Sequence, residues 1–138
     1  MPSNNFKLVL DPSSCSLIND KGEVTLIPIG PISLAEQQFK NKIPSHLEIE
    51  SAIESIEDLI MPLDKDLQKN RSLLMVSSNV TDLDLQDISN KQHILSIEQF
   101  EDVFNKALFD KASKNIIAAL LIIRECLHHL RFTQLIFE

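Results

Sequence analysis

The segment RECLHHL, residues 124–130, brings a carboxylate, a thiol and two imidazoles together within a short stretch of sequence. On a helix, Glu125 lies beside His128 at i+3 and beside His129 at i+4, so one helix face could carry all three side chains. Glu-x-x-His occurs in di-iron bundles, which need a second such motif and further carboxylates that this sequence lacks. A catalytic zinc site needs three protein ligands. Glu125, His128 and His129 are therefore the candidate metal ligands.

The same segment has a simpler interpretation, which we prefer. With Arg124, these residues form a stripe at i, i+1, i+4 and i+5, as expected where the last turns of a helix emerge toward water. A protonated histidine near a helix C-terminus also interacts favourably with the carbonyl dipoles. Cys126 is expected to be a small, partly buried apolar residue and not a nucleophile.

A second candidate is the acidic segment from Glu48 to Asp66, which has seven carboxylates against the single Lys65. It lacks the alternating oxygen ligands and central glycine of a calcium loop. We interpret it as a solvated helix face, with a protein-binding surface as the alternative. The sequence has only two glycines, Gly22 and Gly30, so no glycine-rich phosphate loop can be written.

The elements that must position these residues start with three short extended segments between Phe6 and Ile29, separated by turn formers at 11–14 and 19–22. This pattern predicts a three-strand antiparallel meander, with an edge strand near Pro28 because proline has no N–H. Residues 72–76, SLLMV, predict a strand buried on both faces, and residues 132–138 predict a closing strand.

Helix starts are marked by capping boxes, in which Ser precedes Glu or Gln by three positions. These boxes begin at Ser33, Ser45 and Ser96; the second helix should stop at Pro62, and a last helix should run from Ser113 or Asn115 to about Leu130. Residues 81–91 look irregular. The predicted fold class is mixed α/β, an N-terminal three-strand meander followed by helices and two further strands, with the helices packed on a mixed sheet.

Composition favours one soluble domain over residues 1–138. The net charge of −7 argues against nucleic acid and against an anionic membrane surface as partners. The longest apolar run, residues 116–123, is too short to span a bilayer, and no secretory signal precedes the first strand. The two cysteines lack CxxC spacing, which is typical of reduced thiols. We therefore expect a cytoplasmic protein.

The order of elements over residues 6–79 resembles the ribonuclease H-like (actin-like) fold superfamily. LVLDPSSCSLI is similar to its first strand and turn, and HLEIESAIESIEDL to its first long helix. The resemblance implies that Asp11 and Glu48 are acids holding paired Mg²⁺ ions, which activate water. Two departures stand against it: Ser77, Ser78 and Asn79 occupy the place of a third acid, and residues 12–14 replace the expected glycines.

Both acids also have structural interpretations, which remain open here. Asp11 could begin a turn before Pro12, and Glu48 could complete the capping box of Ser45.

The sequence leads us to expect a non-enzymatic interaction module without a cofactor. Its partner would be another protein, bound through the acidic helix 46–61 or the edge strand near Pro28, and a homodimer is also compatible. The alternative is a Mg²⁺-dependent hydrolase of ribonuclease H-like type that uses Asp11 and Glu48. A third hypothesis is a zinc or iron protein that uses Glu125, His128 and His129.

Overall fold

The N-terminal strands form the predicted meander. In the computed structural model, which describes residues 5–67, 71–81, 83 and 94–138, β1 (Phe6–Leu10) pairs antiparallel with β2 (Cys15–Ile18), and β2 pairs antiparallel with β3 (Val24–Ile27). The β2–β3 turn is closed by Asn19, whose side-chain oxygen accepts the amide hydrogens of Lys21 and Glu23. β3 is an edge strand, as expected near Pro28.

Three more strands complete a mixed sheet in the order β3-β2-β1-β4-β6-β5. β4 (Leu73–Ser78) lies parallel to β1, β6 (Gln134–Phe137) lies parallel to β4, and β5 (Leu95–Ser96) pairs antiparallel with β6. The predicted mixed α/β class is therefore confirmed. The two-residue β5 has no counterpart among the predicted strands, because a strand that short carries no alternation to detect.

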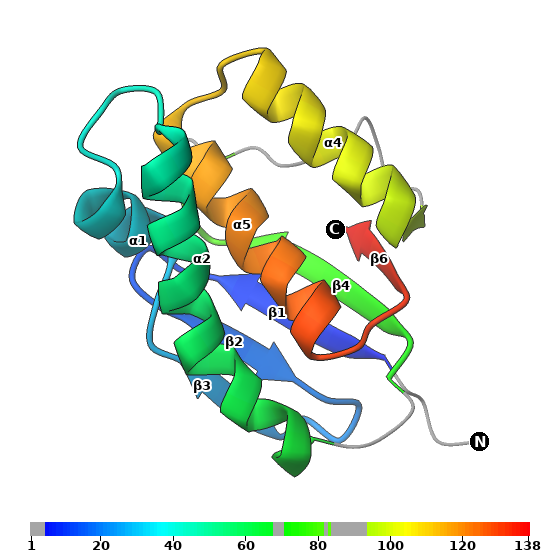
Figure 1. Cartoon of the computed structure of the whole chain (residues 1–138). Helices are drawn as coiled ribbons and strands as arrows, with labels where there is room; N and C mark the ends of the chain where they lie inside the picture. The colour runs from blue at the N-terminus through cyan, green and yellow to red at the C-terminus, as the bar shows by residue number, and fades with distance from the viewer. Residues whose placement is uncertain (1–4, 68–70, 82, 84–93) are drawn as a thin grey trace.

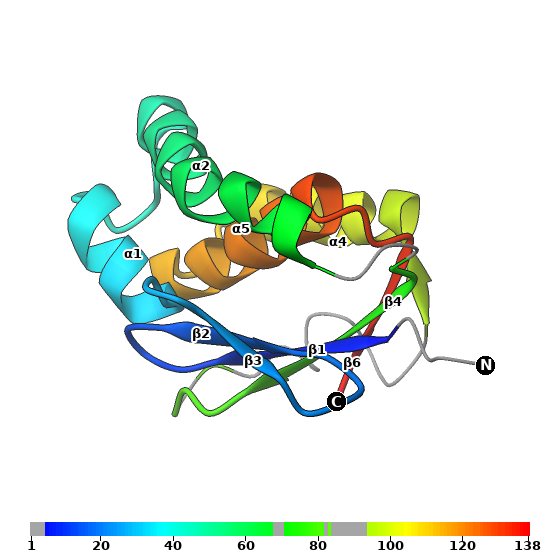
Figure 2. The ribbon, with the colours of Figure 1, turned by 90° about the horizontal axis from the view of Figure 1, so that it is seen from below.

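All the described helices cover one face of this sheet (Figures 1 and 2). They are α1 (Pro31–Gln38), α2 (His46–Ile60), which continues into the 3₁₀ turn η1 (Met61–Asp66), α4 (Ile97–Phe109) and α5 (Lys114–His129). The prediction that β4 is buried on both faces is therefore wrong. Leu74 and Val76 point into the helix-covered core, whereas Leu73 and Met75 on the other face stay partly exposed.

Two of the three predicted capping boxes are present. Ser45 and Ser96 accept hydrogen bonds from the amides of Glu48 and Gln99, whose side chains accept in return from the two serine amides. The box predicted at Ser33 is wrong, because α1 already begins at Pro31, a residue well suited to the first helical position. Ser33 is instead the third residue of α1.

The core lies between the sheet and the helices, with α5 at its centre. α5 packs against α1, α2 and α4, and its residues from Ile117 to Ile123 are all buried, as its apolar sequence predicts. Such burial of leucine and isoleucine contributes roughly 1.5–3 kcal/mol for each side chain.

Among the described residues, no helix is long and apolar enough to cross a membrane. Most of the irregular segment expected at 81–91 lies outside the described residues.

Candidate functional site

Asp11 and Asn79 lie together at one edge of the sheet. Asp11 follows β1 and Asn79 follows β4, and since these two strands are parallel neighbours, both residues stand at the same carboxyl edge. The Asn79 amide Nδ2 donates to Asp11 Oδ1 over 3.0 Å, and the Asn79 backbone N–H donates to the Leu10 carbonyl over 2.8 Å. In open α/β sheets this edge is where ligands commonly bind. Within the described residues, the second carboxylate oxygen of Asp11 has no partner.

The loop after Asp11 is held against the start of α1. The amides of Ile32 and Ser33 both donate to the Pro12 carbonyl over 3.1 Å. A Cβ on Gly30 would lie only 2.3 Å from the Asp11 carbonyl oxygen, so this close approach requires glycine. The amides of Ile32 and Ser33 thus bind within the protein, and Asp11 is the partly exposed carboxylate at this edge, beside the exposed Asn79.

Glu48 does not join Asp11. Its carboxylate accepts the backbone N–H groups of Lys40 (2.7 Å) and Ser45 (2.9 Å) and the side-chain amide of Asn41 (3.3 Å). The hydrogen bonds from the Ser45 and Lys40 amides lower the pKa of Glu48 below its usual value. Glu48 therefore caps α2 and orders the loop before it, as the structural alternative proposed. None of its described hydrogen bonds involves Asp11, and a shared metal role for the two acids stays a prediction.

The predicted metal ligands on α5 fall into two separate sets of contacts. His128 Nε2 lies 3.3 Å from the Glu101 carboxylate on α4, whereas His129 Nε2 lies 2.7 Å from Glu57 on α2 and 3.3 Å from Glu125. Glu125, His129 and Glu57 therefore converge, with one potential ligand atom from each lying within 4.8 Å of the others. His128 does not belong to this group.

The solvated-stripe interpretation of residues 124–129 is wrong for Glu125. Only 3% of its side chain is exposed, and its carboxylate contacts Arg124 at 3.0 Å as well as His129. Burial raises the pKa of Glu125 above its usual value, an effect that the positive charge of Arg124 opposes. Arg124 also contacts Glu101 at 2.8 Å and lies over the ring of Phe104.

Glu57 is the member of this group that sequence reasoning missed. It lies on the acidic helix α2, directly after the buried Ile56 and three positions before the buried Ile60 in sequence. A carboxylate at the border of an apolar helix face is a weak signal that it meets a partner from a neighbouring helix. Nothing in the sequence identifies that partner as α5.

Both cysteines are buried and free, which excludes them as nucleophiles in the folded state. Burial, assisted by the nearby charge of Asp11, raises the pKa of Cys15 to about 12, and burial also raises the pKa of Cys126.

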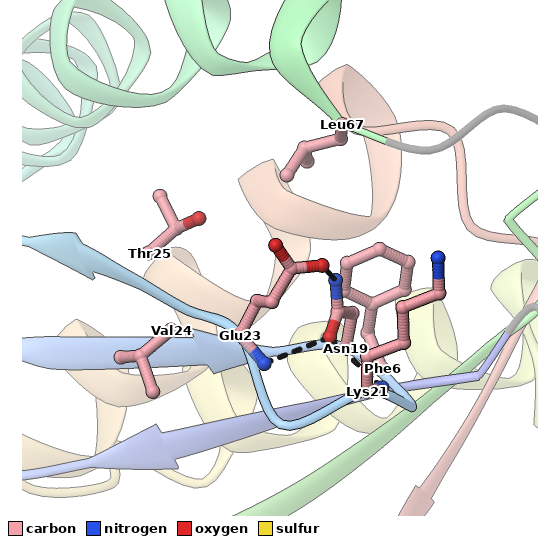
Figure 3. Close-up of a pocket in the computed structure, with 7 residues that line it drawn as sticks. All are labelled: Phe6, Asn19, Lys21, Glu23, Val24, Thr25 and Leu67. Carbon is pink, nitrogen blue, oxygen red and sulfur yellow. Dashed lines mark hydrogen bonds between the residues drawn. The ribbon is translucent and has the colours of Figure 1, made fainter.

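Pockets lined by described residues include two that are open to solvent. The first, of about 390 Å³, lies at the opposite end of β1 from Asp11 (Figure 3). Its Asn19 and Glu23 side chains hydrogen-bond to each other and close the β2–β3 turn. The second, of about 560 Å³, is lined by Ile43, Ser113, Asn115 and three lysines, Lys42, Lys111 and Lys114.

No protein-family model matches this sequence, and no curated protein sequence matches it. The fold, by contrast, matches solved structures along its whole length. A Ppx/GppA phosphatase from Aquifex aeolicus matches with a TM-score of 0.74 at 20% identity over 100% of this chain and 54% of the matched chain. An exopolyphosphatase from Cytophaga hutchinsonii matches with a TM-score of 0.74 at 12% identity over 99% and 53%. The chain thus spans about half the length of these structures.

These structures belong to the actin-like and ribonuclease H-like superfamily, so the resemblance seen in the sequence is confirmed for the fold. They also correct the main functional prediction. Proteins that share this fold are described as phosphatases and exopolyphosphatases, which contradicts the expected non-enzymatic, protein-binding module. The expectation of no cofactor is corrected with it, because enzymes that transfer phosphoryl groups commonly use divalent cations.

Proposed function

We propose that this chain forms one half of a divalent-metal-dependent phosphatase and holds a Mg²⁺–phosphate complex at the Asp11 edge. The observation that supports this proposal most is the position of Asp11, a partly exposed carboxylate at the carboxyl end of β1 in a fold shared with phosphatases. The substrate class would be a phosphoanhydride such as polyphosphate, in line with the description of one matched structure as an exopolyphosphatase.

The residues at this edge fit one Mg²⁺ ion better than the pair implied by the ribonuclease resemblance. Mg²⁺ keeps several waters and is commonly bound by one or two carboxylates together with substrate phosphates. Asp11 supplies one carboxylate, one oxygen of which has no hydrogen-bond partner in the described part of the chain, and the Asn79 side chain could add a carbonyl oxygen. Glu48 contributes nothing here, since its carboxylate orders the loop before α2.

Each residue at the edge has a separate role in this proposal. Asp11 would bind the cation, and Asn79 would orient the carboxylate through its 3.0 Å hydrogen bond. The bound cation would neutralise phosphate charge and polarise a phosphoryl oxygen. The groups that face Asp11 across the substrate would come from outside these 138 residues, in keeping with matched structures nearly twice as long. The cytoplasm remains the proposed compartment, supported by two free cysteines.

Calorimetry with tripolyphosphate tests this proposal. The chain should bind tripolyphosphate in the presence of Mg²⁺ and not in the presence of EDTA. Asp11→Asn should weaken the binding by roughly 10-fold or more, because one charge-assisted contact is worth about 1.5–3 kcal/mol. Glu48→Gln serves as the matched acid-to-amide control and should bind normally. Binding that persists in EDTA, or that Asp11→Asn leaves unchanged, would refute the proposal.

A further inference from the structure

The contact between α2 and α5 contains an unusual arrangement of ionisable groups. His129 Nε2 lies 2.7 Å from a Glu57 oxygen and 3.3 Å from a Glu125 oxygen. A ring nitrogen carries at most one hydrogen, so it cannot donate a full hydrogen bond to both oxygens. A cation in place of that hydrogen could bind the nitrogen and both oxygens together. The protein thus directs three potential ligand atoms toward one point.

The charges around this point leave a deficit of positive charge. Three carboxylates take part in the connected contacts, those of Glu57, Glu101 and Glu125. Among the residues that the structure describes, Arg124 supplies the guanidinium that contacts them. Counted without the imidazoles, these groups have two more negative charges than positive ones. One divalent cation would balance that difference. Since the Glu125 side chain is 3% exposed, solvent does little to stabilise its charge.

The ligand types and spacings suit zinc. Zn²⁺ takes imidazole nitrogen and carboxylate oxygen at about 2.0–2.2 Å in a tetrahedral arrangement, which places neighbouring ligand atoms roughly 3.3 Å apart. The His129–Glu125 distance already has that value, the 2.7 Å His129–Glu57 distance would need to lengthen, and all three ligand atoms lie within 4.8 Å of one another. Arg124, bound to the other oxygen of Glu125, would orient this ligand in the way that outer-shell partners orient metal ligands.

We propose that Glu57, Glu125 and His129 form a zinc site that joins α2 to α5, with water in the fourth position. This site is separate from the Asp11 edge and does not depend on the proposed phosphatase function. Its ligand set differs from the one predicted from sequence, because Glu57 takes the place of His128. By joining the two helices, the ion would stabilise the folded state by mass action, as any ligand specific to that state does.

Titration of the metal-free chain with Zn²⁺, and with Co²⁺ as a spectroscopic probe, tests the proposal. We expect one Zn²⁺ per chain, visible Co²⁺ absorption typical of four ligands, and displacement of Co²⁺ by Zn²⁺. Glu57→Gln and His129→Asn should each weaken Zn²⁺ binding by about 100-fold or more, since even an outer-shell partner is worth roughly 10- to 100-fold. Zn²⁺ should raise the melting temperature of the wild type and not that of Glu57→Gln.

Two control variants make the result specific. His128→Asn removes the neighbouring imidazole, which forms an ion pair with Glu101 and lies outside the group of Glu57, Glu125 and His129, and should leave Zn²⁺ affinity within about threefold. Asp11→Asn should leave Zn²⁺ binding intact, so failure of the phosphate site and failure of the zinc site can be told apart. The proposal is wrong if the wild type shows no saturable Zn²⁺ binding. It is equally wrong if His128→Asn abolishes Zn²⁺ binding while Glu57→Gln retains it. The Glu57 side chain is partly exposed, and circular dichroism can verify that the Glu57→Gln variant folds.

Discussion

At the scale of single residues, Asp11 and Glu48 show how the same chemical group takes on different roles. Glu48 has three hydrogen-bond donors from its own loop and capping box, so its charge is used for folding. Asp11 has one donor, Asn79, which leaves one oxygen free within the described structure. The number of protein donors around each carboxylate, and not its residue type, separates the structural acid from the candidate ligand.

Glu48→Gln should destabilise the protein in a pH-dependent manner. The folded state lowers the pKa of Glu48 below the usual value of 4.5, so the carboxylate contributes stability above that pH and loses it as the pH falls through the lower, folded-state pKa. Melting temperatures of wild type and variant should differ most at neutral pH and converge in acid. Glu50→Gln is the control, because Glu50 contacts only the exposed His46 among the described residues. A constant gap at all pH values would contradict the capping role.

Neither cysteine should react in the native protein. Burial holds the thiol of Cys15 at a pKa of about 12, so almost no thiolate exists at neutral pH, and Cys126 is fully buried. After treatment with iodoacetamide, mass spectrometry should find an unmodified chain under native conditions and two added groups in guanidinium chloride. Rapid native labelling of either thiol would show that the core between α5 and the sheet opens readily.

At the scale of elements, the loop between β1 and β2 depends on the glycine that precedes α1. The Gly30 backbone approaches the carbonyls of Asp11 and Pro12 so closely that no side chain fits, and the first amides of α1 then bind the Pro12 carbonyl. This contact fixes the chain direction immediately after Asp11. The position of the candidate site is therefore set by how α1 begins.

Gly30→Ala should cost about 2 kcal/mol or more of unfolding free energy, because the new methyl group meets backbone atoms that cannot move aside easily. Gly22→Ala is the matched control, because a Cβ added at Gly22 would meet no atom within 4 Å. Only the positive φ of 81° at this position opposes the substitution, at a cost of about 1 kcal/mol. Urea denaturation measures both. A smaller loss for Gly30→Ala than for Gly22→Ala would mean that the close approach is not needed.

Local signals in the sequence predicted most elements correctly. The Ser45 and Ser96 capping boxes act within one helical turn, so four residues were enough to locate each helix start. The Ser33 box failed because Pro31 allows α1 to begin earlier. The burial of β4 was misjudged for a different reason, since an apolar run does not reveal whether helices cover one face or both.

At the scale of the whole molecule, both candidate sites combine residues that are far apart in sequence. Asn79 meets Asp11 because β4 enters the sheet beside β1, and Glu57 meets Glu125 and His129 because α2 packs against α5. The sequence suggested Asp11, Glu125 and His129 as candidates. Its signals for their partners were weak: Asn79 stands where the fold resemblance expects a third acid, and Glu57 borders an apolar helix face. The partner predicted for the acidic helix 46–61 or the edge near Pro28 stays a prediction.

The proposed function depends most on Asp11 binding the cation and phosphate at the carboxyl edge of the sheet. Two-dimensional NMR of the ¹⁵N-labelled chain tests this claim directly when Mg²⁺ and tripolyphosphate are added together. The largest shifts of backbone amides should fall at the non-proline residues of 10–14, 30–33 and 78–80, and Asp11→Asn should abolish them. Shifts centred instead on Lys42, Lys111 and Lys114, the lysines that line the second pocket, would contradict the account, as would no shifts at all.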